Sequence, residues 1–131
     1  MNQFWKLVRV GIFVVLVFGT VASYSSLRFG FPYTYASVGS ILIYSTIGYL
    51  GFRSAGLKSS VGAALFVELV DATLGWWISW WIGPGALPED QRTIPFIAVT
   101  AVFVVVFAVA CAFVGAGVAR VMHGPRQISN A

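Results

Sequence analysis

The sequence predicts an all-α integral membrane protein with four antiparallel transmembrane helices, and three observations predict it. Only 9% of the residues are charged, whereas 59% are hydrophobic, and the mean hydropathy is +0.88. Four long apolar segments are separated by short breaks that contain glycine, proline or charged residues. Basic residues gather at alternate breaks, as they do in chains that cross a bilayer repeatedly. A soluble domain carries about 25% charged residues, so the outer solvent of this chain must be lipid.

Four segments are long enough to span a membrane. A transmembrane helix needs about 20 mainly apolar residues to cross the hydrocarbon core. The segments that meet this requirement cover about residues 4–24, 33–52, 57–82 and 94–121. The chain has 131 residues, enough for one domain, so we expect a single transmembrane domain over residues 1–131.

The breaks between the segments carry turn signals. Residues 28–32 (Arg-Phe-Gly-Phe-Pro) separate the first two segments. Residues 53–58 are few enough for a tight hairpin, so the second and third helices are expected to be antiparallel neighbours. The Gly-Pro-Gly run at 83–85 ends the third helix. Thr93 is placed to cap the fourth helix, and Pro95 is tolerated in its first turn.

The distribution of charges predicts the orientation of the helices. One side of the membrane receives most of the basic residues and no acidic residue, whereas the other receives Arg28, Glu89, Asp90 and Arg92. Because basic residues concentrate on cytoplasmic loops, we expect both termini in the cytoplasm and a plasma or inner membrane as the location. The basic residues assigned to the cytoplasmic side are Lys6, Arg9, Arg53, Lys58, Arg120 and Arg126.

The first segment has an alternative interpretation as a cleaved signal peptide. It has a basic start, an apolar stretch and a small-residue site at 20–22 (Thr-Val-Ala), which are the marks of such a peptide. Cleavage would leave three crossings and place the new N-terminus outside. The apolar stretch is long enough to span the bilayer, which favours a retained helix.

Four tryptophans, Trp76, Trp77, Trp80 and Trp81, cluster near the outer end of the third segment. Tryptophan and tyrosine favour the interface between membrane and water, so the cluster predicts an aromatic belt. An aromatic platform for carbohydrate or another ligand is the alternative.

Several kinds of chemistry lack support in the sequence. Neither the lone cysteine, Cys111, nor the lone histidine, His123, has a neighbour at a metal-ligand spacing. Phosphate-loop, HExxH and GxSxG motifs are absent. We therefore expect no metal, no cofactor and no enzymatic activity. The net charge of +4 does not predict nucleic-acid binding, because the basic residues lie at the ends of membrane segments.

The candidate functional residues are two acids, Glu68 and Asp71, in the third segment. Counted from Lys58 at about 1.5 Å per residue, they lie about 15 and 20 Å into a core about 30 Å thick. Two ionisable side chains at this depth cost about 5–7 kcal/mol on insertion scales. The aliphatic and phenylalanine side chains of the segment contribute about 3–6 kcal/mol in favour of insertion. The helix therefore inserts only marginally by itself and needs neighbouring helices to pack around the acids.

The two acids share a helical face with small residues. Positions three apart project from one side of a helix, and the bulky Phe66, Val70 and Trp77 point elsewhere. Small residues mark the faces on which transmembrane helices pack, so this face should meet similar faces on the second and fourth helices. The three small-residue faces comprise Ala64, Ala72, Gly75 and Ser79 beside the acids, then Ser37, Ser40, Tyr44, Gly48 and Gly51, and finally Ala101, Ala108, Ala112, Gly115 and Ala119.

Hydroxyl groups are the expected partners of Glu68 and Asp71. No lysine or arginine reaches their depth, and both burial and mutual repulsion favour the neutral form of a carboxyl group. At least one acid is therefore expected to be protonated at neutral pH. The supporting polar residues, chosen by depth and face, are Ser40, Tyr44, Thr20 and Ser79.

Two functional hypotheses remain open. In the first, the protein transports protons, cations or a cationic substrate and uses Glu68 and Asp71 as its site. A chain of 14.1 kDa encloses little pathway, so a transporter of this kind should be a homo-oligomer in the lipid bilayer. In the second, the chain is an accessory or structural subunit of a larger membrane complex, and the acids are neutral groups that hydrogen-bond between helices.

Overall fold

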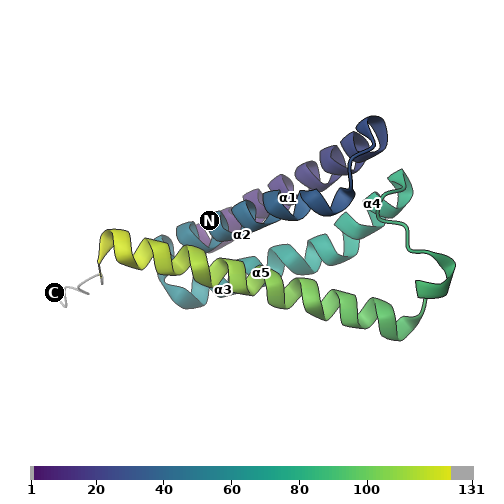
Figure 1. The fold of residues 1–131 in the computed structure, drawn as a ribbon. Coiled ribbons are helices and arrows are strands. Elements are labelled where there is room, and N and C mark those ends of the chain that lie inside the picture. The colour runs from purple at the N-terminus through teal and green to yellow at the C-terminus, as the bar shows by residue number, and fades with distance from the viewer. Residues whose placement is uncertain (1, 125–131) are drawn as a thin grey trace.

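The computed structural model describes residues 2–124, and each secondary-structure element in that range is helical (Figure 1). A π-helical turn, η2, joins α3 to α4 without a break, so these three elements form one continuous rod. The long helices are α1 (Gln3–Phe29), α2 (Ala36–Ala55), α3 (Leu57–Val70), α4 (Trp76–Ile82) and α5 (Ile94–His123). The short elements are η1 (Tyr33–Tyr35), η2 (Asp71–Gly75) and η3 (Glu89–Gln91).

The structure confirms four helices that are long and apolar enough to cross a membrane. They are Gln3–Phe29, Tyr33–Ala55, Leu57–Ile82 and Ile94–His123. Each of the four predicted segments falls within one of them. Arg126, which was assigned to the cytoplasmic side, lies outside the described residues.

Two helix ends differ from the sequence-based expectation. Helix α1 continues to Phe29 and ends at Gly30, whose φ of 69° is in the left-handed region that glycine adopts easily. Arg28 consequently lies in the last turn of α1 and not in the break. Thr93 stands at the N-cap of α5, but its side chain makes no capping hydrogen bond. The Thr93 carbonyl instead accepts the backbone N–H of Ile97 at 3.0 Å.

Small residues allow α2 to pack closely against α5 and α3. A Cβ atom added at Gly48 would overlap the backbone of Ala112, and one added at Gly115 would overlap the backbone of Ser45. Gly51 meets the backbone of α3 in the same way. Close approach of this kind is what small residues provide between transmembrane helices, and it confirms the predicted packing faces of the second and fourth helices.

The protein has a core of small side chains and an exterior of large apolar ones. Tyr44 is the largest side chain that is fully buried. Phe66 and Trp77 are exposed, as predicted, whereas Val70 is partly buried. Cys111 is a free, buried cysteine of the core, which agrees with a packing role.

The bundle is tightly packed at one end and open at the other. The contacts of Gly48, Gly51 and Gly115 belong to the half that contains the connection between α2 and α3. At the opposite end, Figure 1 shows the first turns of α5 diverging from α4, with the connection of residues 83–93 between them.

Candidate functional site

A cavity of about 520 Å³ lies in the open half of the bundle. Its walls come from α1, η1 and the start of α2, the α3–η2–α4 rod, the connection after α4, and α5. Thr34 and Ala86, in the two connections at this end, line the cavity and are exposed to the outside. Residues of the α2–α3 connection do not line it. The cavity therefore reaches the surface at the open end of the bundle.

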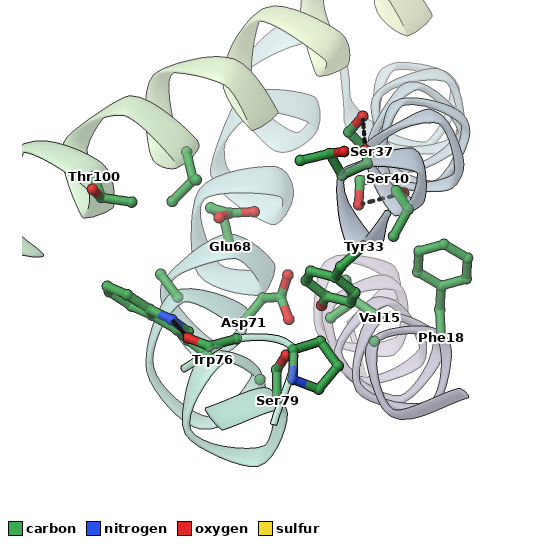
Figure 2. A pocket seen from close by; sticks show the side chains of 18 of the residues that line it. Val15, Phe18, Tyr33, Ser37, Ser40, Glu68, Asp71, Trp76, Ser79 and Thr100 are labelled. Carbon is green, nitrogen blue, oxygen red and sulfur yellow. Dashed lines mark hydrogen bonds between the residues drawn. The ribbon is translucent and has the colours of Figure 1, made fainter. Parts of the chain in front are cut away.

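Glu68 and Asp71 line the cavity together. Figure 2 shows the two carboxyl groups projecting into the same space, Glu68 from the end of α3 and Asp71 from the start of η2. Glu68 is only 4% exposed, whereas Asp71 is partly buried. The sequence predicts both acids on one helical face, and in the structure that face lines the cavity.

The π-helical turn η2 begins at Asp71 and ends at Gly75. A Cβ atom at Gly75 would overlap Oδ1 of Asp71, so the carboxyl group lies directly over the glycine. The Thr73 hydroxyl donates to the carbonyl oxygens of Leu69 and Val70, at 2.8 and 3.1 Å. π-Turns inside α-helices are frequent at functional sites, and this one sets the position of Asp71.

The hydroxyl of Tyr44 lies next to the two acids. Tyr44 is 2% exposed, and its hydroxyl is close enough to Glu68 and Asp71 to interact with both. Its geometry nevertheless completes no hydrogen bond with any described residue. Cys111 of α5 is also near Glu68. Tyr44 and Cys111 are thus the titratable groups that neighbouring helices place beside the acids.

The other predicted supporting residues have different positions. Ser40 and Ser79 line the cavity, and Ser79 is held by a buried hydrogen bond from the Ser23 hydroxyl at 2.9 Å. Thr20 is exposed and donates to the carbonyl of Leu16 at 2.7 Å. The structure does not bring Thr20 to the acids, because Thr20 is on an exposed face of α1 and lies between Leu16, which is near Gly75, and Ser23, which meets Ser79, beyond the level of Asp71.

The four tryptophans differ in exposure, and Trp80 is partly buried with the Arg92 guanidinium over its ring. Trp77 and Trp81 are exposed, as an interfacial belt requires. Trp76 lines the cavity and donates its indole N–H to the carbonyl of Gly85 at 3.1 Å, which holds the connection after α4 against the cavity. Sequence reasoning treated the four as one belt, so it missed Trp76 as a lining residue. The one-turn spacing of Trp76 from Ala72 was the signal that could have identified it.

Most of the polar side chains that line the cavity present acceptors, whereas the hydroxyls of Tyr33, Thr34 and Ser79 can still donate. The hydroxyls of Ser37, Ser40 and Thr100 donate their protons to carbonyl oxygens three or four residues earlier, at 2.7, 3.4 and 2.9 Å. The oxygen lone pairs of these hydroxyls remain available, since a hydroxyl has one proton and two acceptor sites. Among the described residues that line the cavity there is no lysine, arginine or histidine.

No protein-family model, curated protein or solved structure matches the chain. The class of the protein is therefore described by its fold and its cavity. The protein has four apolar helices of membrane-spanning length and a cavity that contains two carboxyl groups and reaches one end of the bundle.

We expect the substitution Gly75→Ala to raise stability less than an unhindered glycine-to-alanine change in a helix, because the added methyl group has to displace the Asp71 carboxyl group at the end of its flexible side chain. Gly117→Ala is the matched control, since an added Cβ at Gly117 has no neighbour within 4 Å and alanine is favoured over glycine in a helix by about 1 kcal/mol. Thermal unfolding midpoints in detergent measure both effects. Equal midpoints for the two variants would contradict the placement of Asp71 over Gly75.

Proposed function

We propose that the protein binds cations in this cavity and exchanges them for protons across a membrane, with Glu68 and Asp71 as the binding site. The observation that carries the proposal is a cavity of about 520 Å³ that contains two carboxyl groups and no basic residue among its described lining. A carboxyl group away from water needs a proton or a positive charge beside it. In this cavity the proton and the cation compete for the same oxygens.

Competition between proton and cation for the two acids couples the movement of one to the movement of the other. A cation that enters the cavity binds the ionised acids and displaces their proton, and protonation of the acids releases the cation. Lower pH favours the protonated acids, so the affinity for the cation falls as the pH falls. The neighbouring titratable groups, Tyr44 and Cys111, are uncharged when protonated, so the acids supply the charge.

The proposal includes an antiparallel arrangement of the four helices with both termini in the cytoplasm. The α2–α3 connection, with Arg53 and Lys58 beside it, is then cytoplasmic, because basic residues concentrate there. The open end of the cavity faces the opposite side. For transport, the close contacts around Gly48 and Gly115 must separate in a second state. A single small chain offers little surface for such a change, so we also propose a homo-oligomer.

Reporter fusions test the orientation. We expect a reporter fused after Phe31 or Glu89 to be active outside the cytoplasm, and a reporter fused after Gly56 or His123 to be active inside. Phe31, Gly56 and Glu89 lie between the long helices, and His123 is the last residue of α5. Paired reporters that are active only outside or only inside the cytoplasm give the measurement. An external signal after His123 would overturn the arrangement.

The exchange itself is tested with purified protein in liposomes that enclose a pH-sensitive dye. A pH gradient is imposed, and a panel of inorganic and organic cations is then added outside. We expect cation-dependent movement of protons that liposomes without protein do not show. Its absence over a broad range of pH and cations would exclude exchange and favour the alternative function, a subunit of a larger membrane complex.

A further inference from the structure

The size of the cavity suits an organic molecule better than a bare ion. Sites for small organic molecules commonly measure about 300–1,000 Å³. An inorganic cation held by two carboxyl groups would fill only a small part of this space.

The chemistry of the lining selects the kind of cation. Ionised carboxylates only accept hydrogen bonds, and the hydroxyls of Ser37, Ser40 and Thr100 have given their protons to backbone carbonyls. The indole N–H of Trp76 is likewise engaged by Gly85. A primary ammonium group has three donors and no acceptor. It complements this lining, whereas a quaternary ammonium has no N–H to donate.

The hydroxyl of Tyr44 is buried beside both acids and is close enough to interact with each, although it completes no hydrogen bond with a described residue. A small rotation of either carboxyl group towards Tyr44, on binding an ammonium group, would give the hydroxyl an acceptor.

The remaining walls suit an apolar body attached to the ammonium group. Val15 and Phe18 of α1, Leu87 of the connection and Val104 of α5 are apolar residues of the lining. Figure 2 shows Phe18 and Tyr33 on one side of the cavity and Trp76 on the other. Aromatic side chains pack against apolar groups and also attract cations through their faces.

From this combination we infer that the substrate is a primary amine with an apolar or aromatic body. Its ammonium group binds between Glu68 and Asp71, and its body extends towards the open end of the bundle. The inference rests on the proposed function and deepens it, because it names the substrate class of the same site.

A matched pair of ligands tests the inference. Phenethylamine and its N,N,N-trimethyl derivative carry the same charge and the same aromatic ring, but only the first donates hydrogen bonds. Binding of each to the full chain in lipid nanodiscs is measured by isothermal titration calorimetry above neutral pH. We expect phenethylamine to bind at least about tenfold more tightly, because hydrogen bonds between charged partners are strong and are lost in the derivative.

Variants locate the binding site. Asp71→Asn should weaken the binding of phenethylamine by about tenfold or more. Glu89→Gln should leave it unchanged, since Glu89 lies in η3, is exposed and does not line the cavity. Equal binding of the two ligands to wild-type protein, or no binding of either, would overturn the inference. The exchange of inorganic cations for protons in liposomes is scored separately, so the proposed function can stand or fall independently of this result.

Discussion

Gly48→Leu and Gly115→Leu are each expected to separate α2 from α5 and to prevent correct assembly of the bundle. The space next to each glycine is occupied by backbone, that of Ala112 at Gly48 and that of Ser45 at Gly115. Backbone in a neighbouring helix cannot rotate away as a side chain can. Overpacking a well-packed core costs about 1–3 kcal/mol, and we expect these substitutions at the upper end of that range. Thermal unfolding and the monodisperse fraction in detergent report the loss.

Val106→Leu is the matched control for the two glycine substitutions. Val106 lies on α5 with 62% of its surface exposed, so a larger apolar side chain there should extend into lipid without disturbing a neighbour. Its unfolding temperature should equal that of the wild-type protein. If all three variants lost the same amount of folded protein, the assignment of the α2 and α5 faces would be incorrect.

The sequence alone predicts the elements that depend on local composition and periodicity. The four apolar helices follow from segment length and from glycine and proline at the breaks, as at Gly30 and Gly83. The faces that hold Gly48 and Gly115 follow from the 3.6-residue period of small side chains. The placement of Glu68 and Asp71 on one face follows from the same period. Each of these features can be derived from one helix at a time.

The features that the sequence did not predict depend on several elements at once. Thr20 lies on an exposed face of α1 and beyond the level of Asp71, because packing between helices sets both the rotation and the level of α1. The π-turn at Asp71–Gly75 contains no proline that would indicate it in the sequence. The cavity arises because α5 diverges from the α3–η2–α4 rod, which is a property of tertiary structure.

Glu68→Gln and Asp71→Asn are expected to fold normally and to lose the exchange of cations for protons. Each amide keeps the shape and much of the hydrogen bonding of the acid but removes the charge and the titrating proton. A hydrogen bond to a charged group contributes about 1.5–3 kcal/mol, so we expect cation affinity to fall by about 10- to 100-fold. The larger loss is expected for Glu68, which is the more buried of the two. Proton movement in liposomes and calorimetric binding measure the two effects.

The dependence on pH distinguishes loss of the site from a general loss of activity. In the wild-type protein, cation affinity should decline as the pH falls, because protons compete for the two carboxyl groups. In an amide variant that retains weak binding, this dependence should be reduced, since one of the competing groups has been removed. Glu68→Leu and Asp71→Leu are the control, because they remove both charge and hydrogen bonding and should damage assembly under either functional hypothesis. Amide variants that assemble normally and exchange cations at the wild-type rate would exclude the two acids as the transport site and leave them as neutral groups that hold the helices together.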